Sequence, residues 1–235
     1  MRLLAIDTST KVAGVALMED GRLVCETNLV SGRTHSERLM ELVDGCMRLA
    51  GWKTGELDIV AAVAGPGSFT GIRIGVAAAK GIAEALGKPV VSVNTLEALA
   101  ASFAGFGGVV APMLDARREQ VYCAVYGGSL EEIMPPCAMG LYELLAFPAV
   151  TAAPSVLFAG DGAIAFHGAI LNTLGSRAIF APPHLMLQRA GAAAWLAHKK
   201  AISGMTMDAA ELLPIYLRKP QAEQARDARE AGNGA

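Results

Sequence analysis

Three consecutive β-strands followed by alternating helices and strands constrain the fold of this chain more than any other feature. Residues 2–7 (RLLAID) form a short apolar run that ends in a carboxylate. Two further β-prone runs meet at Asp20-Gly21, a dipeptide typical of a two-residue hairpin turn. Helical and strand patterns then alternate up to about residue 104. The order β-β-β-α-β-α-β-α predicts a mixed sheet.

A second, thinner unit repeats this pattern. Residues 108–128 again predict a strand ending in an aspartate, a charged turn and another strand, and LLAIDTS and APMLDAR are similar strand-to-aspartate junctions. We therefore predict an α/β, two-lobed fold with mixed sheets, of the actin/Hsp70/sugar-kinase (ASKHA, ribonuclease H-like) class. The first lobe is predicted over residues 1–104, a reduced second lobe over 105–220, and a loose tail over 221–235.

The composition narrows the classes of partner. The formal net charge is −2, so the chain has no overall field that attracts nucleic acid or an anionic membrane. Any contact with RNA is expected to be local or to pass through a partner protein. Hydrophobic residues make up 53% of the chain and charged residues 18%, which suggests that some surface is reserved for a partner.

Cysteine and histidine usage argues against a metal site and a disulfide framework. Cys25, Cys46, Cys123 and Cys137 are scattered without a CxxC pair, and no HExxH motif occurs. We predict reduced thiols, a cytoplasmic location, no metal and no catalytic residue. No signal peptide is expected, because the first apolar run meets Asp7 at once. No apolar stretch reaches the ~20 residues of a membrane helix.

The stretch GPGSFTGIRIG (65–75) resembles a phosphate-binding loop, but its spacing is wrong. A P-loop needs GxxxxGK[ST], and the nearest downstream lysine is Lys80. The Rossmann pattern GxGxxG fails because Thr70 stands where its last glycine would be. We interpret the stretch as a tight strand-to-helix turn with Ser68 or Thr70 as the cap, and keep an anion site as the alternative. The turn and cap residues are Gly65, Pro66, Gly67, Ser68 and Thr70.

The helix predicted at 71–86 carries a small residue at every fourth position. These residues are Gly71, Gly75, Ala79 and Ala83. Residues four apart share one helix face, so a backbone can approach closely there, either from the same chain or from a partner helix. The neighbouring face, with Ile74, Ala78, Ile82 and Leu86, is predicted to be core.

The helix predicted at 34–50 carries the other half of the candidate partner surface. Its buried face is predicted from the three-and-four spacing of Leu39, Leu42, Val43, Cys46 and Leu49. Met40 and Met47 form a second apolar stripe suited to an adaptable partner surface. His35, at the start of this helix, is a further candidate interface residue. We predict that the Gly71/Gly75/Ala79/Ala83 face and this methionine stripe bind a partner.

Two polar junctions are candidate nucleotide contacts. Asp7, Thr8, Ser9 and Thr10 lie where the first strand enters the hairpin, and could contact a phosphate or its magnesium. A polar β-turn explains them equally well. The charged stretch LDARREQVY (114–122) is interpreted as a solvated turn with internal ion pairs rather than a catalytic site.

Several stretches together resemble the TsaB (YeaZ) family. They are LLAIDTST, THSERL, AGPGSFTGIRIGVAAAKGIA, VNTLEALA, MLDARREQVY and PIYLRKP. The resemblance covers most of residues 1–125 and residues 214–220. It implies the two-lobed fold above and a non-catalytic subunit of the bacterial system that installs threonylcarbamoyl on adenosine in tRNA.

The resemblance also implies partners and cofactors. The partners would be the catalytic, metal-carrying paralogue TsaD, the ATPase TsaE and, functionally, TsaC, with a homodimer when the chain is alone and tRNA reached only through the complex. Kinases of this class carry a glycine after the first-strand aspartate (DxGTT), which both DTST and DARR lack. We therefore expect no tightly bound nucleotide in the isolated chain, although ATP or ADP could bind in the complex. An autonomous small kinase and a glycoprotease-like peptidase remain as alternatives.

Overall fold

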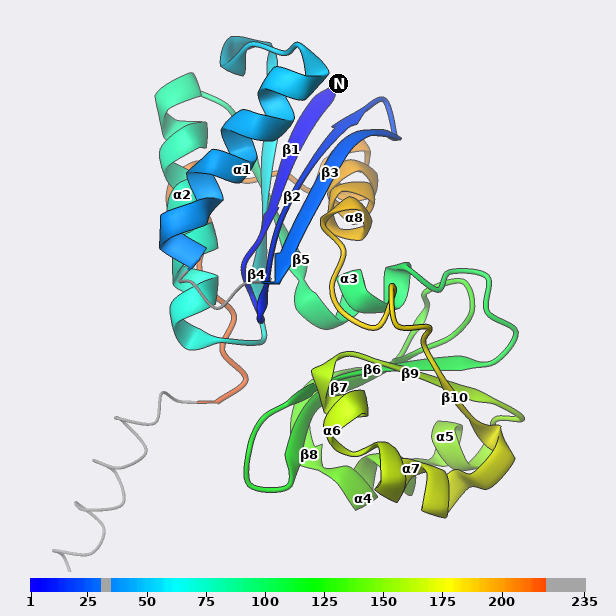
Figure 1. The fold of residues 1–235 in the computed structure, drawn as a ribbon. Helices are drawn as coiled ribbons and strands as arrows, with labels where there is room; N and C mark the ends of the chain where they lie inside the picture. Colours follow the sequence, from blue (N-terminus) through cyan, green and yellow to red (C-terminus); the bar gives the residue numbers. More distant parts are fainter. Residues whose placement is uncertain (31–34, 219–235) are drawn as a thin grey trace, which may run out of the picture.

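The computed structural model describes residues 1–30 and 35–218, which form two lobes around two five-stranded sheets (Figure 1). The strand order in the first sheet is β3-β2-β1-β4-β5. β1 pairs antiparallel with β2 and parallel with β4, so the sheet is mixed, as predicted. The strands are β1 Arg2–Asp7, β2 Val12–Glu19, β3 Arg22–Val30, β4 Ile59–Gly65 and β5 Val90–Asn94.

The second sheet repeats the topology of the first. Its order is β10-β9-β6-β7-β8, with β6 antiparallel to β7 and parallel to β9. Read from the edge at β8, this order matches that of the first sheet strand for strand, which confirms the predicted internal repeat. The strands are β6 Val109–Asp115, β7 Gln120–Tyr126, β8 Glu132–Gly140, β9 Val156–Ala159 and β10 Ala178–Phe180.

Helices cover both faces of the first sheet. α1 (His35–Ala50) and α2 (Phe69–Leu86) lie side by side on one face, and α8 (Ala190–Ile202) covers the other (Figure 1). The alternation of β1 side chains explains this arrangement: Leu4 and Ile6 pack toward α1 and α2, whereas Leu3 packs toward α8. The apolar residues 3–6 of β1 therefore lie between two helical layers. Within the described residues, no helix is long and apolar enough to span a bilayer.

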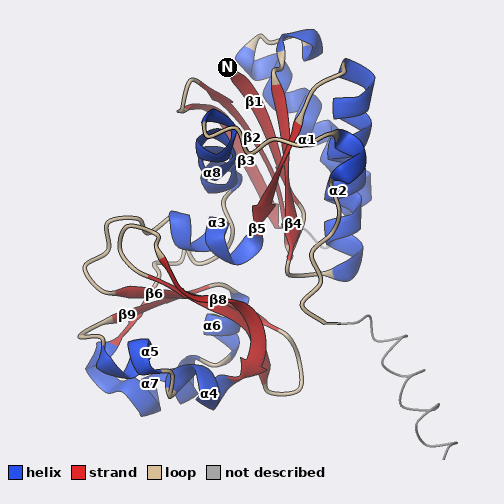
Figure 2. Ribbon diagram, turned by 180° about the vertical axis from the view of Figure 1, so that it is seen from behind, coloured by secondary structure: helices blue, strands red, loops and turns tan. Residues whose placement is uncertain are grey.

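The remaining helices are short. α3 (Thr95–Ala101) lies between the lobes (Figure 2) and joins them, because its Leu96 and Leu99 share an apolar cluster with Val110 and Leu157 of the second lobe. The others are α4 Leu141–Leu145, α5 Pro148–Ala152, α6 Asp161–Ala165, α7 His167–Leu174, and the 3-10 turns η1 Thr54–Glu56, η2 Gly175–Arg177 and η3 Ala209–Glu211.

The predicted boundary of the second lobe is wrong beyond residue 189. α8 packs on β1, β2 and β3, and Val90 pairs with Met207 in an antiparallel bridge, so residues 190–212 return to the first lobe. The physical reason lies in the small buried side chains of α8, such as Ala190, Ala194 and Ala197, which let this helix lie close to the sheet. The predicted tail at 221–235 lies outside the described residues.

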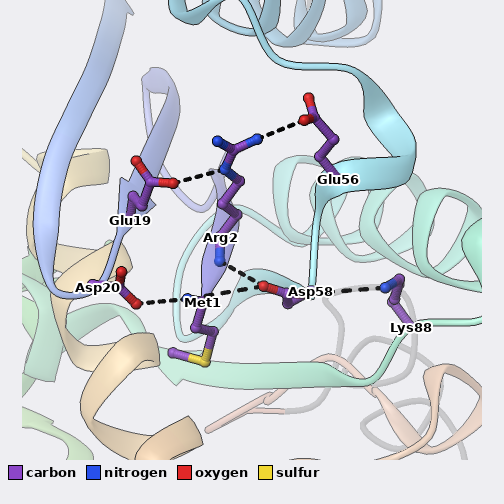
Figure 3. Close-up of polar contacts among 7 residues, drawn as sticks. All are labelled: Met1, Arg2, Glu19, Asp20, Glu56, Asp58 and Lys88. Carbon is purple, nitrogen blue, oxygen red and sulfur yellow. Dashed lines mark hydrogen bonds and ion pairs between the residues drawn. The ribbon is translucent and has the colours of Figure 1, made fainter.

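A polar network ties together the end of the first sheet where β1 begins (Figure 3). Arg2 Nε lies 2.8 Å from Glu19 and its Nη1 lies 2.9 Å from Glu56 of η1. The amino group of Met1 lies 2.6 Å from Asp20, in the predicted Asp20-Gly21 turn. These partly exposed pairs join β1, the hairpin and η1, and salt weakens them. The residues drawn are Met1, Arg2, Glu19, Asp20, Glu56, Asp58 and Lys88.

The small-residue face of α2 packs on β1 of the same chain, so the prediction that it contacts a partner is wrong. Gly71, Gly75, Ala79 and Ala83 are all buried. A Cβ atom at Gly71 would collide with the Thr8 carbonyl oxygen, and one at Gly75 with the Thr8 hydroxyl. That hydroxyl donates to the Gly71 carbonyl at 2.7 Å, and the bond is buried. The glycines thus permit an internal contact between helix and strand.

The other two apolar stripes also differ from the prediction. Met40 is 53% exposed but Met47 only 5%, because the chain folds back after α1 and Trp52 packs on the same core as Met47. Leu49, predicted as core, is 79% exposed. Ile74 and Ile82 of α2, also predicted as core, are only partly buried. The face of α2 expected to be internal therefore lies partly on the surface.

This packing predicts opposite outcomes for two alanine substitutions in α2. Gly75→Ala should destabilise the fold by about 1–3 kcal/mol, because the buried Thr8 hydroxyl must move. Gly81→Ala should stabilise it by about 0.5–1 kcal/mol, because nothing lies within 4 Å of the new methyl group. Urea unfolding followed by circular dichroism measures both. Equal effects of the two changes would show that the Gly75 face is not tightly packed.

Candidate functional site

A cavity of about 630 Å³ lies between the two lobes. It is placed after the carboxyl ends of β1, β4 and β6, where open α/β sheets usually bind ligands. The first lobe contributes the turn after β1, His35 and the start of α2, and the second lobe contributes the β6–β7 turn, Tyr122 and Asp161. Residues 215–218, near the end of the described chain, form a further wall.

The DTST segment is held by hydrogen bonds within the chain. Thr8 donates its hydroxyl hydrogen to Gly71, and Ser9 donates to Asp7 Oδ1 at 2.6 Å. Thr10 donates to Gln188 Oε1 at 2.8 Å. All three hydroxyl donors predicted as possible phosphate contacts therefore already have a partner. Ser9 and Thr10 line the cavity, whereas Asp7 and Thr8 lie behind it.

Asp7 is a buried carboxyl group with one satisfied oxygen. Its Oδ1 accepts hydrogen bonds from the backbone N–H and the hydroxyl of Ser9, and its Oδ2 has no partner among the described residues. Burial raises the pKa of Asp7, and the Ser9 hydrogen bonds and the charge of His35 only partly oppose this effect. This environment favours the neutral acid more than an exposed position would.

His35 is turned toward its own chain. It is half-buried, and its Nε2–H donates to the carbonyl oxygen of Thr10 at 2.6 Å. Among the described residues, no group of three His, Cys, Asp or Glu side chains could hold a metal ion. All four cysteines are free thiols. His35 therefore fixes the turn after β1 and borders the cavity.

The loop after β4 forms a tight turn and a helix cap. Gly65 and Gly67 have positive φ angles of 125° and 154°, and the peptide bond before Pro66 is cis. Ser68 is the cap: its hydroxyl accepts from Gly71 N–H at 3.2 Å, and its own N–H donates to the Ser9 carbonyl at 2.7 Å. A Cβ at Gly67 would collide with that same carbonyl. The loop is thereby fixed against the turn after β1.

Thr70 does not act as the cap. It is exposed in the first turn of α2 and lines the cavity beside Ser68 and Phe69. The N-terminus of α2 consequently borders the cavity, and its dipole adds to the positive side chains on the opposite wall.

The β6–β7 turn brings positive charge to the second-lobe wall. Arg117, Arg118 and Glu119 all have positive φ angles, of 67°, 53° and 59°. Asp115 organises this turn: its Oδ1 accepts from Arg117 N–H at 2.8 Å, and its own N–H donates to Asp161 at 3.1 Å. Asp115 therefore has a structural role, as the interpretation of a turn with internal ion pairs proposed, and both arginines line the cavity.

Sequence reasoning missed the aromatic and cationic cluster beside the cavity. Arg73 lies with its guanidinium carbon 3.7 Å from the Phe69 ring, and its Nε donates to the Tyr216 hydroxyl at 2.8 Å. The rings of Phe69 and Tyr216 are stacked, with centroids 4.9 Å apart. Arg73 and Tyr216 are 143 residues apart in the chain, so no spacing could connect them. The only signal was the quoted stretch PIYLRKP, which contains Tyr216.

The environment of Asp7 predicts a pH-dependent effect of Asp7→Asn. Because the native pKa is raised, the folded state keeps a proton that the unfolded state releases above about pH 4, so wild-type stability falls as pH rises through this interval. The amide introduced by this substitution cannot ionise and avoids this loss. The variant's melting temperature should therefore gain on the wild type as the pH rises above about 4, the range in which the unfolded wild type loses its proton. Asp44→Asn, at an exposed position of α1, is the control. A gain that does not change with pH would contradict the assignment.

A family model and a curated relative both match most of the chain. A family model described as "TsaD: tRNA N6-adenosine threonylcarbamoyltransferase" matches residues 29–226. The tRNA threonylcarbamoyladenosine biosynthesis protein TsaB of Bacillus subtilis (strain 168) is 33% identical over 226 residues, which cover 95% of this chain and 96% of that protein.

Solved structures agree with the sequence comparison. A Pseudomonas aeruginosa protein described as similar to peptidase YeaZ superposes with a TM-score of 0.79 at 32% identity, covering 92% of this chain and 99% of that one. The ethanolamine utilization protein EutJ from Carboxydothermus hydrogenoformans has a TM-score of 0.55 at 14% identity, covering 83% and 90%. The latter match concerns the fold alone and supports the predicted actin/Hsp70/sugar-kinase class. Since one third of the residues are identical over nearly the full length of both chains, this protein belongs to the TsaB (YeaZ) family.

Proposed function

We propose that this chain is a non-catalytic scaffold subunit of the bacterial machinery that installs the threonylcarbamoyl group on adenosine beside the anticodon of tRNA. The names of its TsaB relatives and the matching threonylcarbamoyltransferase family model support the pathway. The observation that carries the non-catalytic role is the DTST segment, whose hydroxyl donors are all engaged inside the chain. A phosphate-binding loop would need such donors free.

We further propose that the outer surface of α1 and α2 binds TsaD. Met40 is exposed there, and Ile74, Ala78 and Ile82 are partly buried along the neighbouring helix. Apolar side chains that stay accessible on a helical layer are candidates for a partner surface. The same surface would support a homodimer when the chain is alone. TsaE would then dock on the complex, with TsaC supplying the activated threonylcarbamoyl group.

Three further proposals concern nucleotide binding, access to tRNA and the location of this chain. The isolated chain binds no nucleotide tightly, although the positive cavity wall with Arg117 and Arg118 leaves room for ATP or ADP in the complex. The net charge of −2 is consistent with tRNA being reached only through the complex. The site of action is the cytoplasm.

The TsaD surface is tested by Met40→Glu. A buried carboxylate at the partner contact should weaken TsaD binding about tenfold or more, measured by titration calorimetry. Leu171→Glu in α7 of the second lobe, at a position 44% exposed, is the matched control. Circular dichroism checks the fold of both variants. Gly75 is unsuitable for this test because it packs internally. Unchanged affinity in Met40→Glu would place TsaD elsewhere.

Reconstitution tests the scaffold role itself. This chain, TsaD, TsaC and TsaE are combined with tRNA, and modified adenosine is measured with each component left out. We expect product to be lost without this chain, and none from this chain alone. Full modification without it would refute the role. Tight ATP binding by the isolated chain would favour the small-kinase alternative, and cleavage of a protein substrate would favour the peptidase alternative.

A further inference from the structure

We propose that residues 212–218 act as a strap that crosses the mouth of the interlobe cavity and sets the angle between the two lobes. This inference concerns the mechanics of the chain and does not depend on the proposed function. The strap begins after η3 on the first lobe and runs down beside α2 (Figure 1), and the side chain of Arg218 contacts the second lobe. Four of its residues, 215–218, line the cavity.

The strap is attached firmly to the first lobe. Ile215 N–H donates to the Ala64 carbonyl at the end of β4, at 2.7 Å. The Ile215 carbonyl lies so close to Gly65 that a Cβ there would collide with it, so Gly65 makes room for the strap. Just before the strap, Lys80 of α2 donates to the Ala210 carbonyl at 2.9 Å.

Tyr216 extends this attachment at the cavity edge. Its ring stacks on Phe69, and its hydroxyl accepts from Arg73. Arg73 also lies over the Phe69 ring, so each of the three side chains contacts the other two. Stacking and cation–π contacts of this kind stabilise partly exposed positions. The strap is therefore held on α2 as far as Tyr216, two residues before Arg218.

Arg218 makes the strap's contact with the second lobe. Its Nη1 donates to the Ala116 carbonyl at 3.1 Å, and its guanidinium carbon lies 5.7 Å from the centre of the Tyr122 ring. Ala116 belongs to the β6–β7 turn and Tyr122 to β7, so the arginine engages two elements of the second lobe. One hydrogen bond and one cation–π contact form a weak link that can open and close.

α3 and the strap connect the lobes in different ways, and the chain segment from β10 to α8 also passes between them (Figure 1). α3 joins them through an apolar cluster that includes Leu99 and Leu114, which behaves as a packed core. The strap joins them across the cavity through the polar contacts of Arg218. A rigid apolar contact together with a weak polar one is a suitable arrangement for a hinge and a latch. Release of Arg218 would let the second lobe turn about α3 and widen the cavity.

Spin-label distances between the lobes test this proposal in the full-length chain. The partly exposed native thiols are first removed by Cys25→Ser and Cys137→Ser. The labels are then attached to two exposed positions, Arg48→Cys in α1 and Asn172→Cys in α7. In the parent we expect one narrow distance distribution. Arg218→Ala should add a second component, with the open-to-closed ratio rising about tenfold.

Controls make either outcome decisive. Arg22→Ala removes an exposed arginine of β3 and should leave the distribution unchanged. Tyr216→Ala should speed hydrogen exchange of the Ile215 amide, which Arg22→Ala should not. An Arg218→Ala distribution that superimposes on the parent would overturn the proposal, as would equal widening in the Arg22→Ala control.

Discussion

The contact between the glycine face of α2 and the end of β1 holds the rest of the first lobe in place. The buried Thr8 hydroxyl, bonded to the Gly71 carbonyl, fixes the helix to the strand at the point where both reach the cavity. Ser68 then lies against Ser9, and the turn after β1 is connected to the loop after β4. Any side chain larger than hydrogen at Gly71 or Gly75 would separate these two elements. The same contact engages the Thr8 hydroxyl, while Ser9 and Thr10 donate to Asp7 and Gln188, so all three hydroxyl donors of this turn already have a partner.

The two strand-to-aspartate junctions of this duplicated fold have diverged. Asp7, after β1, is fully buried with a raised pKa, whereas Asp115, after β6, is partly exposed and organises a turn that presents two arginines. One junction thus belongs to the interior and the other to the cavity wall. The two copies of the repeat therefore share a topology but differ in the surroundings of this aspartate.

Local sequence patterns predicted the helices and strands well, but they predicted less well which faces are buried and which distant segments are in contact. The order of the first elements along the chain, the Asp20-Gly21 hairpin and the cap at Ser68 depend on neighbouring residues, and they are found as predicted or, for the cap, as one of two predicted choices. The buried face of α2 was assigned to the wrong side of the helix. Glycine and alanine carry little hydrophobic signal, even where they form the buried face. The return of α8 to the first lobe and the Arg73–Tyr216 pair depend on contacts between distant segments, which no periodicity reports.

The α1 and α2 layer has an internal face and an outer face, and we propose that the outer face binds TsaD. Two methionines of α1, seven residues apart, report on the two sides. Methionine oxidation followed by mass spectrometry, with and without TsaD, measures both at once. We predict that Met40 oxidises rapidly in the free chain and is protected by TsaD, while Met47 is slow in both states. Rapid oxidation of Met47 in the free chain, with protection by TsaD, would contradict this assignment of faces.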